Sequence, residues 1–372
     1  SILSMAMGRG GSVPQIPIWE QADLLIGPFR NREGASQLGD LARVDFDSAK
    51  NMGGLTGLDP VLIVDEDSKI NINALNRSSI AALFTARQFQ GLVQSPALNP
   101  YFEQRDPDGQ FTDRLTLFSN LVDFVDFDEN TFNAQVLLDQ TASQAATTPE
   151  DTFYGSLRPP YRRRNAPLDS VDELRLVRGL GDDDLWHKII DPDPSNPRRR
   201  TVTVWGQGAV NVNTANAQTL LALICAFGQQ SPQCQDPARM SAFMTAVTMV
   251  QALTLSMGIP LFNSPQGFVN TIQGQPPLGP MLRQLGLDPV VIPDRGALER
   301  NVAVESKVFS VYAEATVNHA RVRVHAVIDM RPQPALPSTF MRASGMTLAP
   351  TASGQMGVVN SRGGTLIYWR ED

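Results

Sequence analysis

One short phrase occurs twice in this chain, each time where a strand pattern gives way to a helix pattern. The first copy is Lys69-Ile-Asn-Ile-Asn-Ala-Leu-Asn76, and the second, about 140 residues later, is Ala209-Val-Asn-Val-Asn-Thr-Ala-Asn216. Each precedes an apolar segment rich in Ala and Leu, at 78–86 and 217–227. Asn, Ser and Thr at such a junction accept hydrogen bonds from the free N–H groups of the first helical turn. The chain is therefore expected to make the same strand-to-helix transition twice, which is a structural device rather than a catalytic one.

Composition narrows the class of protein. With 372 residues, 42% of them apolar and 19% charged, the chain is long enough for more than one core and has the balance of an ordered globular protein. Its formal net charge of −7 argues against non-specific binding to nucleic acid, which needs a basic face. The three histidines form no zinc pair, and neither a Gly-x-Ser-x-Gly elbow nor a phosphate loop is present. No enzyme is expected.

Strand patterns lie at both ends of the chain and helix patterns between them. Residues 309–317 and 320–328 alternate in polarity around Asn318-His319, which predicts an antiparallel hairpin with one buried face. Further strands are predicted at 61–64, continuing through 70–72, and at 365–369. The fold class is therefore α+β: a small antiparallel sheet domain with a large, mainly helical domain inserted. The predicted sheet domain is discontinuous, with residues 1–73 and 303–372, and the inserted helical domain comprises residues 74–302.

Residues 170–190 resemble a helix-hairpin-helix. Short helices predicted at 172–177 and 183–190 flank Gly179-Leu-Gly181, which allows a tight turn. In DNA-repair versions of this motif the turn presents backbone N–H groups to a phosphate. Here Asp182, Asp183 and Asp184 follow at once, and three carboxylates would repel a phosphate. A structural use is favoured, while a nucleic-acid-binding protein of the DNA-uptake type stays open as the alternative function.

An acidic cluster at 123–130 is the candidate metal site. Asp126, Asp128 and Asn130 have the Asp-x-Asp-x-Asn spacing that places oxygen atoms around a hard cation. Thr131 and Leu137 replace the Gly and the closing Glu of an EF-hand, so further ligands must come from elsewhere, and the next pair of carboxylates is Glu150-Asp151. A solvated helix end is the alternative, and a calcium-dependent hydrolase would need a nucleophile or acid pair that the sequence does not show.

Three other segments carry weaker signals. Asp191-Pro-Asp193-Pro-Ser195 shares part of the metal-binding pattern, but its prolines favour a plain loop. The Arg runs at 162–164 and 198–200 are typical of solvated side chains or local ion pairs. The apolar stretch 240–262 contains several Ser, Thr and Gln residues, so a core helix is expected rather than a membrane span.

The two cysteines favour one disulfide. Cys225 and Cys234 are separated by eight residues that include Gly and Pro, and no other cysteine competes for either. Such a pair suits a small disulfide loop in an oxidising compartment. Two buried free thiols are the alternative.

Seven segments in order resemble the minor pseudopilin K family of the bacterial type II secretion system. They are Asp65-Glu66-Asp67 with Lys69-Ile-Asn71-Ile-Asn73, Leu121-Val-Asp123-Phe-Val-Asp126-Phe-Asp128, Glu150-Asp151-Thr-Phe-Tyr154, Pro159-Pro160-Tyr161-Arg162, Asn165-Ala-Pro-Leu, Asp172-Glu173-Leu174, and Asn211-Val-Asn213-Thr214-Ala215. With the hairpin they cover roughly residues 59–330. The ordered set, more than any single segment, carries the resemblance.

The resemblance implies a non-enzymatic subunit at the tip of the periplasmic pseudopilus. It implies binding to the minor pseudopilins I and J, with the major pseudopilin filament below and no nucleic acid as a partner. It also implies calcium in the inserted domain, with Asp126, Asp128, Glu150 and Asp151 as ligands. The family's apolar N-terminal helix, which anchors it in the inner membrane of a Gram-negative cell, would precede Ser1. The stretch 332–364 has no assigned role.

Overall fold

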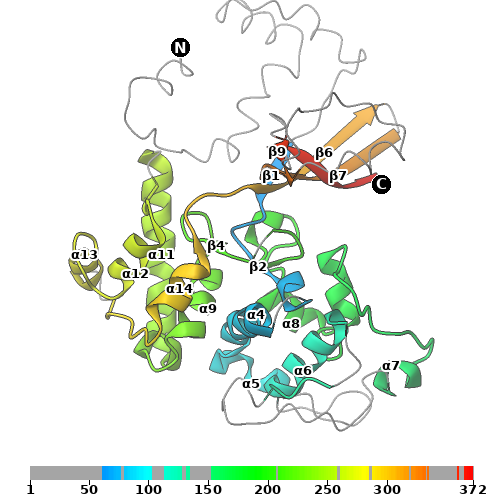
Figure 1. Ribbon diagram of the computed structural model, residues 1–372, viewed down its shortest axis with the longest axis horizontal. Helices are drawn as coiled ribbons and strands as arrows, with labels where there is room; N and C mark the ends of the chain where they lie inside the picture. Colours follow the sequence, from blue (N-terminus) through cyan, green and yellow to red (C-terminus); the bar gives the residue numbers. More distant parts are fainter. Residues whose placement is uncertain are drawn as a thin grey trace, which may run out of the picture. The chain divides into compact units, whose positions relative to one another are not determined.

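The computed structural model describes most of the chain after residue 60. The described residues are 61–76, 79–102, 113–127, 131–134, 152–206, 208–257, 260–284, 287–317, 320–331, 333–334, 358–359 and 364–371. They form two compact units (Figure 1). Residues 65–306 belong to the helical unit, and residues 61–64 and 307–371 belong to the sheet unit. The sequence prediction puts these boundaries at 73/74 and 302/303, whereas the backbone contacts group residues 65–73 with the helical unit.

The sheet unit is built on a sheet of four strands in the order β1-β6-β7-β10. The strands are β1 Leu62–Asp65, β6 Val308–Val317, β7 Ala320–Asp329 and β10 Thr365–Glu371. The pairs β6–β7 and β7–β10 are antiparallel, with Phe309 opposite Ile328 and Trp369 opposite Ala326. The predicted hairpin and the predicted last strand are therefore confirmed. A second, two-stranded ladder joins β8 Gln333–Pro334 to β9 Val358–Val359, at either end of the stretch without an assigned role.

One row of rings crosses the middle of the sheet, and its outer strand is exposed. His325 on β7 stacks on Tyr312 of β6 at 4.2 Å between ring centroids and lies 5.2 Å from Tyr368 of β10. Along β10 almost every residue is exposed, and Leu366 and Trp369 keep 55% and 54% of their surface in contact with solvent. A strand that exposes large apolar side chains is unusual on a protein surface, because such side chains favour burial.

The helical unit begins with a long run of helices around a short strand. In chain order these are β2 Ile70–Asn71, η3 Ile72–Asn76, α4 Ser79–Val93, η4 Pro96–Leu98, α5 Asn99–Phe102, α6 Arg114–Val125, α7 Thr152–Ser156, η6 Val171–Leu176, α8 Asp183–Ile189 and η7 Pro197–Arg199. Strand β3, Val202–Thr203, closes this first half by pairing with β2 in parallel.

The second half of the helical unit repeats that plan. Its elements are β4 Val210–Asn211, α9 Ala217–Phe227, α10 Pro232–Gln235, α11 Pro237–Met257, α12 Pro265–Ile272, α13 Gly279–Gln284, α14 Arg295–Arg300 and β5 Val302–Ala303. Strands β4 and β5 pair in parallel, as β2 and β3 do. Each half therefore opens with a strand, crosses through helices, and returns beside its first strand.

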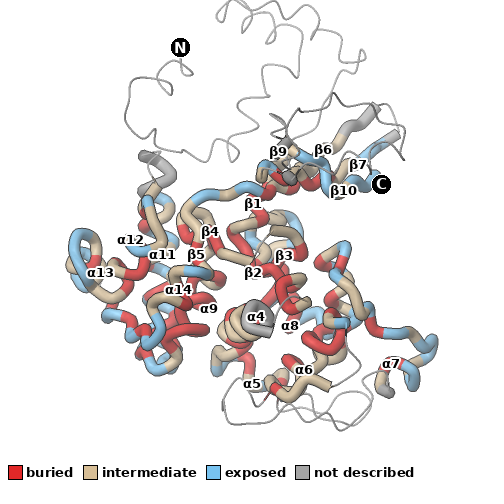
Figure 2. Tube along the Cα trace, in the orientation of Figure 1, coloured by how far each residue is buried: buried red, intermediate tan, exposed pale blue. Residues whose placement is uncertain are grey.

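Helices α4 and α9, one from each half, pack side by side. The rings of Phe84 and Phe227 lie 5.6 Å apart, and Gly91 brings the α4 backbone against the backbone of Ala222. A Cβ at position 91 would lie inside the van der Waals contact distance of the Ala222 carbonyl. The interior around this contact is continuous through both halves, as the buried segments in Figure 2 show.

The strand-to-helix transitions form as predicted, with local differences. Helix α9 has the predicted bounds, whereas α4 continues seven residues beyond the predicted end at Ala86. Strand β2 ends at Asn71 rather than Ile72, because the Asn71 side chain accepts the Asn73 N–H at 3.0 Å and turns the backbone into η3. The stretch predicted as one apolar helix contains α11, which buries Met240, Phe243 and Val250. Among the described residues, no helix is long and apolar enough to cross a membrane.

Candidate functional site

The first Asn phrase holds its half of the helical unit together through one side chain. Asn73 Nδ2 donates to the carbonyl oxygens of Leu168 and Val204, at 2.8 Å each. Its Oδ1 accepts the N–H of Leu168 at 2.7 Å. A single amide thus satisfies three backbone groups from two distant segments, and Asn71 Nδ2 adds a fourth contact to the carbonyl of Gly206 at 2.8 Å.

The second Asn phrase makes the same bonds in its own half. Asn213 Nδ2 donates to the carbonyl oxygens of Phe262 and Val304, at 2.9 and 3.0 Å, and its Oδ1 accepts the Phe262 N–H at 2.9 Å. Asn211 Nδ2 donates to Ser306 Oγ at 2.7 Å. The helical unit is therefore two versions of one motif, and the repeated phrase is the device that closes each version.

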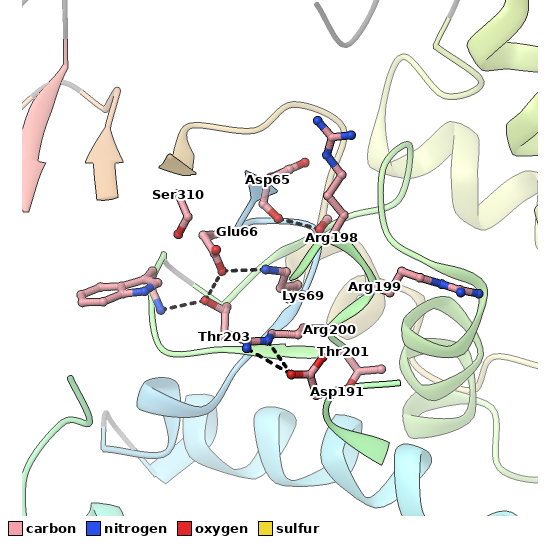
Figure 3. A network of polar contacts seen from close by, with 12 residues as sticks. Asp65, Glu66, Lys69, Asp191, Arg198, Arg199, Arg200, Thr201, Thr203 and Ser310 are labelled. Atoms are coloured by element: carbon pink, nitrogen blue, oxygen red, sulfur yellow. Dashed lines mark hydrogen bonds and ion pairs between the residues drawn. The ribbon is translucent and has the colours of Figure 1, made fainter. Parts of the chain in front are cut away.

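A buried ion pair lies beside the first phrase (Figure 3). Lys69 Nζ and Glu66 Oε2 are 3.0 Å apart, and both side chains are almost fully buried. Thr203 Oγ1 donates to the same carboxylate oxygen at 2.6 Å, and the Trp205 N–H donates to Thr203 Oγ1 at 3.1 Å. Burial lowers the pKa of Lys69, against the opposing effect of Glu66. The pair is retained because each charge compensates the other inside the unit.

Asp65 is a second buried acid, and it is bound differently. Its Oδ2 accepts hydrogen bonds from Thr214 Oγ1 and Ser306 Oγ, each at 2.5 Å. Burial raises the pKa of Asp65 to about 7, although the two hydroxyl groups act in the opposite direction. The two Asn phrases thus differ in their polar surroundings: an ion pair accompanies the first, and a carboxyl group bonded to hydroxyls accompanies the second.

The acidic segment 191–195 is a plain loop, as its prolines favour. Arg200 binds Asp191 Oδ2 through Nε and Nη2, both at 3.1 Å. Asp193 accepts the Ser195 hydroxyl at 2.6 Å, which lowers the pKa of Asp193. Arg200 thus binds one oxygen of Asp191, while the other, Oδ1, is buried without a hydrogen-bond partner, and Asp193 is bound by Ser195 and Arg199.

The predicted calcium region is described only in part. Asp126 follows the last turn of α6 as its C-cap, with its N–H bonded to the Val122 carbonyl at 2.9 Å. Its carboxylate lies 3.9 Å from the Arg163 guanidinium, which is itself buried and donates to the Asp123 carbonyl at 2.9 Å. The Asp123 carboxylate accepts the Phe132 N–H at 2.6 Å. Asp126 therefore lies at the C-terminal end of α6 and has a cationic neighbour.

The other three predicted ligands, Asp128, Glu150 and Asp151, lie outside the described residues. Within the described part of the chain, no group of three or more His, Cys, Asp or Glu side chains could hold a metal ion. Of the histidines in that part, His187 contacts the Asp191 carbonyl at 2.9 Å, and His325 belongs to the row of rings in the sheet. The calcium site therefore stays a prediction.

The hairpin-like segment carries its acids as caps and ion pairs. A left-handed Gly179, with φ of 92°, turns the chain between η6 and α8. Asp182 accepts the Leu185 N–H at 2.8 Å and so caps α8, while Asp183 pairs with Arg175 at 2.5 Å. The chain's own carboxylates lie at the helix N-terminus that a phosphate would approach. This arrangement fits the structural role that the sequence favours for the segment.

Cys225 and Cys234 form a disulfide that joins the end of α9 to α10. Both cysteines are buried, and the short loop between them keeps α10 against α9.

Comparison with known proteins identifies a domain of the chain. Residues 68–187, which are 120 of the 372 residues, match the family model described as type II secretion system (T2SS), protein K. This segment holds the first Asn phrase, the Asp126 region and the hairpin-like turn. The chain thus contains a domain of a type II secretion component.

One solved structure shows a weaker similarity. A chain of the GspK-GspI-GspJ complex from enterotoxigenic Escherichia coli is 19% identical, with a TM-score of 0.44, over 75% of this chain and 79% of that one. No curated protein matches the chain in sequence.

Sequence reasoning missed the groups that complete these networks. Thr203, Ser306 and Arg163 lie far along the chain from the acids they contact, and none belongs to a recognisable motif. One signal was present: Val202-Thr203-Val204 and Val302-Ala303-Val304 are similar apolar triplets, each of which follows one Asn phrase.

Proposed function

We propose that this chain is a minor pseudopilin of the K type, which forms the tip of a type II secretion pseudopilus in a complex with the minor pseudopilins I and J of the same system. The match of residues 68–187 to protein K carries the proposal. In this assembly the sheet unit docks on the partner subunits, and the bulky helical unit restricts growth of the filament above it. The major pseudopilin filament lies below this subunit, in the periplasm. A helix upstream of Ser1 anchors this subunit to the inner membrane.

The open outer strand of the sheet supports docking there. Leu366, Ile367 and Trp369 on β10, with Val322 on β7, expose apolar surface that a soluble monomer would normally cover. Docking is tested by co-expressing the chain with its cognate minor pseudopilins I and J and isolating the complex. Wild type is expected to elute with both partners, and Trp369→Glu is expected to lose them. Met249→Glu, on an exposed position of α11, is the matched control and retains both. If the wild-type chain elutes alone, the proposed assembly is wrong.

We also propose that calcium binds the loop that follows α6. Asp126, Asp128, Glu150 and Asp151 supply carboxylate oxygens, the ligands that Ca²⁺ prefers. Asp126 fits as an entry point, because it lies at the end of α6 with its side chain still partly accessible. The nearby Arg163 guanidinium opposes a cation, so the site requires the combined charge of the other three carboxylates.

The calcium proposal is tested by thermal melts in calcium and in EGTA. At a calcium concentration 100-fold above the dissociation constant, binding stabilises the folded state by about 2.7 kcal/mol. Asp126→Ala should remove most of the shift between the two melts, and Asp193→Ala, in the loop already satisfied by the chain, should leave it intact. Equal melting temperatures of the wild type in calcium and in EGTA would contradict the calcium proposal and leave the pseudopilin proposal unaffected.

A further inference from the structure

The strongest unexplained feature of the helical unit is the buried acid at its entrance. Among the described residues, Asp65 is the first of this unit and Ser306 is the last. The Asp65 carboxyl group bonds Ser306 Oγ and Thr214 Oγ1 at 2.5 Å, so it connects the entering segment, the leaving segment and the second Asn phrase. Only 6% of the residue is exposed, and its Oδ1 atom is buried without a hydrogen-bond partner.

We propose that the Asp65 carboxyl group is a proton-dependent clasp, which holds the entering and leaving segments of the helical unit together when it is neutral. The arrangement favours the neutral form because, among the residues that the structure describes, no cation forms an ion pair with the Asp65 carboxylate. Lys69 acts on Asp65 through its charge, but Lys69 is already paired with Glu66 at 3.0 Å. A neutral carboxyl group still accepts both hydroxyl bonds, whereas an ionised one leaves a buried charge and draws water into the clasp.

The other charged groups around the clasp do not change this sign. Asp67, from the same loop, raises the pKa of Asp65 further, and Lys69 lowers it less than burial raises it. On the leaving segment Ser306 has charges of both signs beside it, Glu305 and Lys307. The second Asn phrase, residues 209–216, has no charged residue. Arg200 on the segment before β3 is bound to Asp191.

The expected pH dependence follows from where the proton is held. The closed clasp binds its proton up to a pH of about 7, whereas an opened Asp65 has an ordinary pKa of 3.8. Opening between these values releases one proton, so the opening constant should rise by about tenfold per pH unit and level off above pH 7. The clasp is therefore closed most firmly in mildly acidic solution and opens most readily at and above neutrality.

Hydrogen exchange on the full chain tests the clasp. The reporters are the N–H groups of Val210, Asn211 and Val212, which bond the carbonyls of Asn301, Asp67 and Ala303. Wild type should show opening that increases about tenfold per pH unit between pH 5 and 6.5, after correction for intrinsic exchange. Asp65→Asn, a neutral isostere, should show no such slope, and Asp67→Asn should retain it with a plateau at slightly lower pH. A slope near zero in wild type, or an unchanged slope in Asp65→Asn, overturns the proposal.

A direct titration keeps the test decisive if Asp65→Asn fails to fold. The carboxyl carbon of Asp65 is followed by NMR in ¹³C-labelled wild-type protein. A midpoint near pH 7 supports the clasp, and a midpoint below pH 5 overturns it. The double variant Thr214→Val/Ser306→Ala supplies a second signature. It removes the two bonds that lower the pKa of Asp65, so the midpoint should move to higher pH.

Discussion

The two Asn phrases bind their surroundings in the same way but lie in different electrostatic settings. Asn73 and Asn213 each satisfy three backbone groups, and in each case the partners are a loop residue and the residue that follows the returning strand. The first phrase stands beside the Glu66–Lys69 ion pair, and the second beside hydroxyl groups that share a single carboxyl group. The same asparagine hydrogen bonds therefore close both halves of the helical unit, although the charged groups around the two phrases differ.

The largest difference between the halves should appear when the ion pair is broken. Lys69→Met leaves Glu66 as an uncompensated buried charge and should cost about 3–5 kcal/mol of unfolding free energy. Denaturant unfolding followed by the helical circular dichroism signal measures the loss. Lys188→Met, an exposed lysine over the Tyr101 ring, is the control and should leave the midpoint nearly unchanged. Similar midpoints for both variants would mean that the pair contributes nothing specific to the first half.

Truncating the two closing amides should affect both halves equally. Asn73→Ala and Asn213→Ala each leave two backbone carbonyls and one N–H without a hydrogen-bond partner. Either variant is expected to lose about 3 kcal/mol of unfolding free energy. Asn73→Asp and Asn213→Asp keep the acceptor but lose both donors, so they should also be strongly destabilised. Two clearly unequal alanine variants would show that the repeated bonds are not equivalent, against the comparison drawn here.

The contact between the halves can be tested at Gly91. Gly91→Ala places a Cβ against the Ala222 carbonyl and should cost about 1–3 kcal/mol through forced displacement of α4 from α9. Gly155→Ala is the matched control, because nothing lies within 4 Å of the new Cβ in helix α7. Crystal structures or melting temperatures of the pair measure the effect. A neutral Gly91→Ala variant would mean that the two halves can separate without loss.

The smallest expected effect concerns the helix that follows each phrase. Asn216 Oδ1 accepts the Thr219 N–H at 2.8 Å and caps α9, so Asn216→Ala should cost about 1 kcal/mol. Asn76, at the corresponding place in the first phrase, instead donates to the Val125 carbonyl. Asn216→Ser should therefore restore most of the lost stability as an alternative cap, whereas Asn76→Ser should not. Thermal melts of Asn216→Ala, Asn216→Ser and Asn76→Ser distinguish capping from tethering.

Patterns local in sequence were predicted well. The Ala- and Leu-rich segment after the second Asn phrase and the alternation from Phe309 to Ile328 predict helix α9 and the β6–β7 hairpin, because both patterns are local in sequence. Helix α4 was predicted too short, since Gln88, Gln90 and Gly91 look like helix-ending polar and flexible residues. In the structure Gln88 and Gln90 are buried, and Gly91 lies against the backbone of α9. This packing stabilises α4 as far as Val93.

The candidate site divides in the same way. The sequence identified Asp126 by its spacing to neighbouring acids, but not the buried Arg163 that lies 3.9 Å from it. It placed Asp65-Glu66-Asp67 between the predicted strand segments 61–64 and 70–72, and gave no sign that Asp65 and Glu66 are buried. Residue types alone cannot predict this, because whether an acid is solvated depends on what the rest of the chain places above it.

By itself, the sequence determined the repeated strand-to-helix transition, the α+β class and the pairing of the only two cysteines, because each follows from residue types at short range. The tertiary structure decided which polar groups surround the buried acids Asp65 and Glu66. Their hydrogen-bond donors Thr203, Thr214 and Ser306 lie 137 to 241 positions away in the sequence. The Thr203–Glu66 contact forms when the first half closes on itself, and the contacts of Thr214 and Ser306 with Asp65 form only when the second half folds against the first. No local pattern encodes contacts over such separations.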